Sequence, residues 1–296
     1  MSKSLSENKK EEIVLVCQNV QAGNTMLAEH ALQEENIIIL DHNDSDISIM
    51  TQDQKLSDVI SEKYLIVFDL DKTLAALGKP IEPETLQCLQ ELSAAGHHLA
   101  IASGKPVFYL MGFCRQANLL KTWMIGENGA QTIFGVDLPP EYRFNVKVKA
   151  ESMEVLADLK RRLVAKFGDK IWLQPNEIEV TPFFDDEQTR IEIEQFIEEI
   201  KDELAQSDIK IYPHSDCFDF LPSNIDKGKA ITNLIKWLEI DPRRTIAVGD
   251  TWNDQALFEA CHYAIAINFP EADKANGKMI HVSDINQALT QIQKIL

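Results

Sequence analysis

Two carboxylates separated by one residue, Asp69 and Asp71, follow the apolar run at residues 64–68 of this 296-residue chain. A continuous run of β-branched and aromatic side chains is typical of a strand that is buried on both faces. Open α/β sheets bind ligands at the carboxyl ends of their strands, which is where these acids would lie. Because like charges this close repel each other, the fold needs a proton or a metal ion beside them. A solvated loop after a strand is the alternative, and this pair alone does not decide between the two.

Three further polar sites stand at the ends of predicted elements. Ser103 and Gly104 follow an apolar segment and supply a hydroxyl and an amide, which near a helix N-terminus favour a phosphate. A plain N-cap serine is the alternative there. Lys227 opens a predicted helix, where a lone lysine is by default a solvated charge. Asp250 and Asp254 follow another predicted strand, and helix capping is their alternative role.

Strand-like and helix-like segments alternate from about residue 63 onward. The predicted strands are 64–68, 99–102, 123–125, 245–248 and 263–267, and the predicted helices include 83–95, 227–238 and one after Ser283. This alternation indicates an α/β fold with a doubly wound, parallel, Rossmann-like sheet. Since acids and hydroxyls follow several of these strands, we expect them to meet at one edge of the sheet.

The middle of the chain has a different pattern, in which a helix followed by a hairpin occurs twice. The predicted elements are a strand at 144–148, helices at 152–167 and 185–204, and hairpins at 171–183 and 209–221. They indicate an inserted α+β cap domain. We therefore expect a catalytic core at 61–136 and 217–296, a cap at 137–216, and an N-terminal extension of unknown role at 1–60. The extension suggests a small βαβ-like unit and is a possible arm for homo-oligomerisation.

Composition limits the function classes. The formal charge of −18 argues against nucleic-acid binding, because phosphate backbones require a basic face. No apolar stretch is long enough to cross a bilayer, and no secretory signal is visible, so no membrane partner is expected. The five cysteines are scattered and form no C-x-x-C pair, which suits reduced thiols and a cytoplasmic protein.

The order and spacing of these sites closely resemble the haloacid dehalogenase-like superfamily of aspartyl-phosphate phosphotransferases. An insertion between Ser103 and Lys227 resembles the subclass IIB, Cof-type members, whose cap lies between the second and third motifs. Residues 127–130 and 226–230 look like two further signatures of that branch. Residues 218–222 are similar to sugar-phosphate members, including sucrose-phosphatase-like proteins.

The resemblance implies roles for the acids. Asp69 would be the nucleophile that forms an aspartyl-phosphate, and Asp71 would be the general acid and base. Mg²⁺ would be held by the Asp69 carboxylate, the Asp71 backbone carbonyl and Asp250. Waters on the ion would be held partly by Asp254 and Asn253. Oxygen ligands and several retained waters are what Mg²⁺ prefers.

The resemblance also implies a phosphate-binding set. Ser103, the Gly104 amide and Lys227 would bind the phosphate oxygens, with Lys227 also offsetting the crowded carboxylates. Thr73 would orient the nucleophile loop, and Asn253 would complete the site.

Some positions depart from the family pattern. Lys105 stands where this branch commonly has an arginine, Lys72 replaces the usual glycine, and Trp252 is bulky for its loop. In the cap, Asn176, His214 and Asp216 could face the site, with ordinary surface turns as the alternative.

The sequence therefore predicts a cytoplasmic, Mg²⁺-dependent phosphatase acting on a small phosphorylated metabolite, with a sugar phosphate as the leading candidate. A phosphomutase of the same superfamily, resembling phosphomannomutase, and a non-catalytic protein that binds a phosphometabolite are the alternatives.

Overall fold

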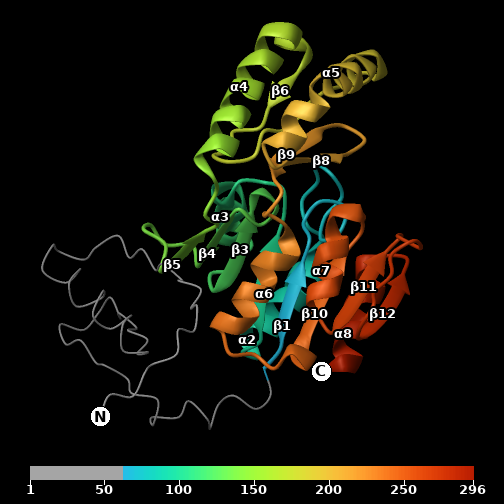
Figure 1. The fold of residues 1–296 in the computed structure, drawn as a ribbon. Coiled ribbons are helices and arrows are strands. Elements are labelled where there is room, and N and C mark those ends of the chain that lie inside the picture. The colour runs from blue at the N-terminus through green and yellow to red at the C-terminus, as the bar shows by residue number, and fades with distance from the viewer. Residues whose placement is uncertain (1–62) are drawn as a thin grey trace, which may run out of the picture. The chain divides into compact units, whose positions relative to one another are not determined.

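The computed structural model describes residues 63–296, and the expectations for residues 1–60 lie outside the described residues. Its centre is an eight-stranded sheet in the order β12-β11-β10-β1-β2-β3-β4-β5 (Figure 1). The strands are β1 (Leu65–Phe68), β2 (His98–Ala102), β3 (Thr122–Gly126), β4 (Gln131–Phe134), β5 (Tyr142–Asn145), β10 (Thr245–Gly249), β11 (Tyr263–Ile267) and β12 (Lys278–Val282). From β12 to β3 all neighbours are parallel, and β4 and β5 add an antiparallel edge. The predicted α/β class is confirmed, with a mixed rather than wholly parallel sheet.

Helices cover both faces of this sheet. One face carries α2 (Pro83–Ala94), α3 (Val107–Gln116) and α8 (Ile285–Ile295), and the other carries α6 (Lys227–Trp237) and α7 (Gln255–Ala260). Strand β1 alternates between the two cores: Ile66 and Phe68 pack with the first group, and Leu65 and Val67 with the second. This double burial is why the strand has an uninterrupted apolar sequence.

Two strands of the sheet were not predicted. The edge strand β12 has Lys278 and His281 exposed and its remaining residues only half-buried, so it lacks the apolar run of an interior strand. Strand β4 begins with the polar pair Gln131 and Thr132, which are nevertheless buried. Both strands are specified mainly by pairing with their neighbours.

The inserted segment is a small α+β layer. Helices α4 (Ala150–Phe167) and α5 (Glu187–Gln206) pack on two short ribbons, β6 (Trp172–Leu173) with β7 (Pro182–Phe183), and β8 (Ile209–Pro213) with β9 (Phe218–Pro222). Figure 1 shows α4 and α5 beyond the end of the central sheet from which the loop after β1 emerges. No helix in the described part of the chain is long and apolar enough to span a bilayer.

The strand predicted at 144–148 was expected inside the insertion, but β5 pairs with β4 in the central sheet. Alternating side chains suit a strand of the insertion as well as a strand of the central sheet, so only the hydrogen-bonded pairing with β4 shows to which sheet β5 belongs. Strand β9 pairs with β8 of the insertion and leads directly towards α6. We therefore propose that the cap leaves the sheet after β5 and returns through β9.

Candidate active site

The acids that follow β1 and β10 meet because these two parallel strands are neighbours. The amide of Asp69 donates to the carbonyl of Val248 at 2.9 Å, which continues the ladder to the end of both strands. Carboxylate oxygens of Asp69, Asp250 and Asp254 lie within 4.8 Å of one another. The edge of the sheet thus concentrates three acids in one place.

Lys227 provides the positive charge for this acidic group. Its Nζ lies 2.7 Å from Asp69 Oδ1 and 2.7 Å from Asp254 Oδ1, and its side chain is 1% exposed. Burial acts against the charged form, but the two carboxylates outweigh it and hold the pKa of Lys227 well above its ordinary value. Lys227 is therefore a buried, charged partner of the acids and not a solvated lysine.

Asp254 does two things at once. Its Oδ1 accepts from Lys227, while its Oδ2 accepts from the amides of Asp250 and Thr251 at 3.1 and 3.3 Å. The hydrogen bond from the Thr251 amide is part of a capping box on the short helix η5 (Trp252–Asp254). The helix-capping role considered for Asp254 is therefore present as well. Gly249 permits this fold-back, because a Cβ there would lie 2.6 Å from the Asp254 carboxylate carbon.

The group carries an excess of negative charge. Burial, together with Asp254 and Asp250, raises the pKa of Asp69 to about 8 despite the opposing effect of Lys227. Burial and Asp254 likewise raise the pKa of Asp250 to about 6, and Thr73 Oγ1 donates to Asp250 Oδ1 at 2.9 Å. Three carboxylates against one lysine favour either protons or a divalent cation.

The donor set fits Mg²⁺. All ligand atoms offered by the three acids are oxygens, as Mg²⁺ prefers. Among the described residues, Asn253 Oδ1 is buried without a hydrogen-bond partner, which suits a water in the hydration shell of an ion. A second group, His214, Cys217 and Asp219, offers nitrogen and sulfur and is a poorer match for this ion.

Asp71 lies beside the insertion. It precedes Lys72, which has a left-handed backbone (φ 67°), and this explains why glycine is the usual residue there. Lys105 Nζ lies 3.6 Å from Asp71 Oδ2 and 4.9 Å from the centre of the Phe183 ring on β7. The lysine that replaces an arginine thus contacts both Asp71 and the cap.

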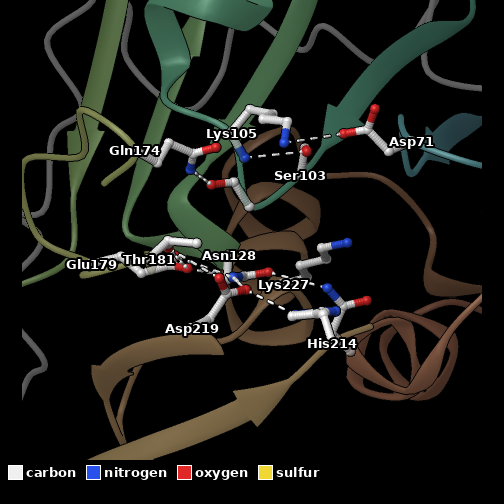
Figure 2. Close-up of polar contacts among 12 residues, drawn as sticks. Asp71, Ser103, Lys105, Asn128, Gln174, Glu179, Thr181, His214, Asp219 and Lys227 are labelled. Carbon is white, nitrogen blue, oxygen red and sulfur yellow. Dashed lines mark hydrogen bonds and ion pairs between the residues drawn. The ribbon is translucent and has the colours of Figure 1, made fainter. Parts of the chain in front are cut away.

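The loop that carries Ser103 is not a simple helix cap. Helix α3 begins at Val107 with Pro106 as its N-cap, so the N-cap alternative for Ser103 is wrong. The buried Ser103 hydroxyl accepts from the amide of Lys105 at 3.2 Å. The Gly104 carbonyl accepts from Gln174 of the insertion at 2.8 Å. The loop is therefore held from both the core and the cap (Figure 2).

Figure 2 also shows a buried polar cluster that sequence reasoning did not assign. Asn128, Glu179, Thr181 and Asp219 are hydrogen-bonded to one another, and His214 contacts Asp219 at 3.0 Å. The signatures around Asn128 and Asp219 were visible in the sequence but had no role attached. Glu179 and Thr181 belong to the predicted 171–183 hairpin, where they alternate with apolar residues. Both side chains are nevertheless buried in the structure, which alternation alone does not reveal.

A cavity of about 520 Å³ opens above these residues, a size suited to a small ligand. Asp69, Ser103, Asp250 and Asn253 are among the residues that line its inner end, and Phe183, Gln174, Thr181, His214 and Asp216 line its cap side. Asn176 is not among the lining residues; it contacts Gln174 and Thr181 instead. Trp252 is 65% exposed and packs edge-on against Phe269 at 4.8 Å, so its bulk does not crowd the loop.

Comparison with known proteins agrees with this architecture. A phosphoglycolate phosphatase from Methanopyrus kandleri is 26% identical over 211 residues, which cover 68% of this chain and 83% of that protein. A haloacid dehalogenase-like hydrolase from Bacteroides thetaiotaomicron superposes with a TM-score of 0.62 at 17% identity, covering 78% of this chain and 100% of that one. The sucrose-phosphatase of Synechocystis sp. PCC6803, solved with sucrose and phosphate, gives a TM-score of 0.55 at 20% identity, covering 79% and 99%.

These structural similarities show the fold. Residues 62–295 match the family model described as sucrose-6F-phosphate phosphohydrolase, and the chain therefore belongs to this family of haloacid dehalogenase-like phosphatases.

Proposed function

We propose that this phosphatase hydrolyses a sugar phosphate, with Mg²⁺ as cofactor and an aspartyl-phosphate on Asp69 as the intermediate. The observation that carries the proposal is the buried contact of Lys227 with Asp69 and Asp254, next to Asp250. A structural role alone would not require three acids and a lysine at the open end of two neighbouring strands.

The residues have distinct tasks in this scheme. The Asp69 carboxylate attacks the phosphorus, and the leaving alkoxide takes a proton from Asp71, which then deprotonates the attacking water. Lys227 orients Asp69 and offsets charge on the phosphoryl oxygens, while Ser103 Oγ and the Gly104 amide bind the remaining oxygens. Solvent exposure of the Asp71 side chain, 27%, suits a group that exchanges protons.

Asp69, the Asp71 backbone carbonyl and Asp250 would hold the Mg²⁺ ion. When bound, the ion neutralises the phosphate dianion so that a carboxylate can approach it. Since Asp254 already accepts three hydrogen bonds, it would assist by fixing the loop of Asp250 and by binding hydration water. Thr73 keeps one Asp250 oxygen in place.

The cap side of the cavity supports a neutral, hydroxyl-rich leaving group. Gln174, Thr181 and His214 offer polar hydrogen-bonding atoms, and Phe183 offers an aromatic face. Of the lysines and arginines that line the cavity, Lys105 is paired with Asp71 and Arg190 with Glu194, whereas Lys72 follows Asp71 on the core side. A second anionic group on the cap side of the substrate would therefore have to compete with these acids.

The test is phosphate release from a panel of sucrose-6F-phosphate, hexose 6-phosphates and phosphoglycolate, with Mg²⁺ and with EDTA. We expect the highest kcat/KM for a sugar phosphate and no Mg²⁺-dependent release by Asp69→Asn. If wild type releases no more phosphate than Asp69→Asn from any of these compounds, the proposed function is wrong.

The same assay separates the alternatives. A phosphomutase would convert a hexose 1-phosphate into its 6-phosphate with little free phosphate. A binding protein would be stabilised by a sugar phosphate without turning it over.

A further inference from the structure

We propose that Glu179 and Asp219 share one proton and together fix the orientation of two amides, Asn128 and Asn253, so that Asn253 presents its oxygen to the metal site. In this arrangement Glu179 and Asn128 are positioning residues that act through Asn253. The inference rests on the proposed Mg²⁺ site. It explains what the buried cluster does for the reaction.

The shared proton follows from counting hydrogens. Thr181 Oγ1 lies 3.0 Å from Glu179 Oε1 and 3.0 Å from Asp219 Oδ1. A hydroxyl has one proton and can donate to only one of these oxygens. The other contact is a hydrogen bond only if that carboxyl group donates to Thr181. One proton must therefore reside on the pair.

The surroundings indicate which acid holds it. Burial and the neighbouring Asp219 raise the pKa of Glu179 well above its ordinary value. Burial acts on Asp219 in the same direction, but the hydrogen bonds that its carboxylate accepts, first of all the one from His214, outweigh burial and lower the pKa of Asp219. The other titratable groups that act on Glu179 or are acted on by it are Glu127, Lys210, Tyr212 and Cys217. Glu179 is therefore the neutral donor and Asp219 the anion.

This acidic pair determines which way the amides point. Asn128 Nδ2 lies 3.1 Å from both Glu179 oxygens and 3.0 Å from Asp219 Oδ2. The reverse orientation would place the amide oxygen against the Asp219 carboxylate. Asn128 Oδ1 therefore faces away and accepts from Asn253 Nδ2 at 3.4 Å. Asn253 Oδ1, which is buried without a partner among the described residues, is left as an acceptor on a residue that lines the same cavity as Asp69 and Asp250.

Backbone conformation and backbone hydrogen bonds hold Asn128 and the cap segment of Glu179 in place. Glu127 and Asn128 both have left-handed backbones, with φ of 49° and 52°. The Glu127 carboxylate accepts from the amides of Glu177, Ile178 and Glu179 at 2.9, 2.8 and 3.0 Å. One core residue thus fixes the cap segment that carries Glu179. Asn128, which contacts both Glu179 and Asn253, thereby fixes the position of the cap segment relative to the loop that carries Asn253.

The decisive measurement is the Mg²⁺ dependence of melting temperature, followed without substrate, together with the Mg²⁺ midpoint of activity. Asn128→Asp removes the donors, and Asn128→Gly removes the amide while tolerating the left-handed backbone. We expect both to raise the Mg²⁺ midpoint about 10- to 100-fold, as changes behind metal ligands do. KM at saturating Mg²⁺ should change less than twofold. Asn224→Asp, which adds the same charge at an exposed amide, is the matched control.

Glu179→Gln tests the proton itself, since an amide can donate where the carboxyl proton did. We expect its Mg²⁺ midpoint to match wild type within about threefold, and Asn128→Asp combined with Glu179→Gln to recover part of the loss. Wild type should also lose melting temperature at alkaline pH, as the proton leaves Glu179, and Glu179→Gln should lose less.

The inference is overturned if Asn128→Gly binds Mg²⁺ as tightly as wild type and Asn224→Asp, or if Glu179→Gln weakens Mg²⁺ as much as Asn128→Asp. If Asn128→Asp does not fold, Asn128→Gly decides. The melting measurement needs no turnover, so a protein that binds Mg²⁺ but hydrolyses nothing would refute the proposed function and leave this test intact.

Discussion

Replacing Lys227 by methionine tests the electrostatics of the site most directly. Methionine fills a similar volume but leaves Asp69 and Asp254 without their cation in a region where Lys227 is 1% exposed. Removing one partner of a buried ion pair costs about 3–5 kcal/mol. For a folded unit of this size, each kcal/mol lowers the melting temperature by about 2–4 °C. In EDTA at pH 8 we therefore expect Lys227→Met to melt about 6–20 °C below wild type.

The size of this loss should depend on protons and on Mg²⁺. Without Lys227 the carboxylates bind protons more readily, so the difference from wild type should shrink at pH 5. Saturating Mg²⁺ should restore part of the melting temperature, because the ion supplies the missing charge. Turnover should fall by at least about 10³-fold, since Lys227 also offsets charge on the transferred phosphoryl group.

The assay is thermal unfolding followed by circular dichroism at both pH values, with and without Mg²⁺. Lys236→Met, which removes an exposed lysine from the same helix α6, is the control and should melt close to wild type. A Lys227→Met protein that melts within 2 °C of wild type in EDTA at pH 8 would refute the argument that this lysine compensates buried acids.

Three other outcomes are expected. Asp69→Asn should fold normally and lose phosphate release by about 10⁴-fold or more, measured with a phosphate-detecting assay; retention of a tenth of wild-type activity would exclude Asp69 as the nucleophile. In the metal-free protein, the raised pKa values of Asp69 (about 8) and Asp250 (about 6) stabilise the fold at low pH, and this stability is lost as pH rises through them. The melting temperature in EDTA should thus fall from pH 5 to 9, and a flat profile would contradict those shifts. Gly249→Ala should displace Asp254 and weaken Mg²⁺ binding by calorimetry, whereas unchanged affinity would mean that the loop absorbs the new Cβ.

The parts of the fold that the sequence predicted are those with strong local patterns. The continuous apolar run of β1 and the helical periodicity of the segment opened by Lys227 each reveal which residues are buried. Strand β12 could not be found in this way, because a half-exposed edge strand has neither a continuous apolar run nor clear alternation. Strand β5 was found but assigned to the insertion, since alternation does not say which sheet a strand joins.

The same limit applies to the site. Acids, a serine and a lysine at predicted strand and helix ends were sufficient to propose the inner end of the cavity. The cluster around Asn128 was not predictable, because Glu179 and Asp219 are 51 and 91 residues away along the chain. A sequence pattern records how each residue is buried locally, whereas a polar network depends on which distant segments come together.

The position of Trp252 has a practical consequence. The chain has four tryptophans; Trp123 and Trp237 pack against each other at 5.1 Å and Trp172 lies on the insertion, so only Trp252 adjoins the acids that would bind an ion. Its indole, exposed and resting on Phe269, provides an intrinsic fluorescent probe. Emission changes upon titration with divalent ions, compared between wild type and Trp252→Phe, would follow occupancy of the site without a label or a substrate.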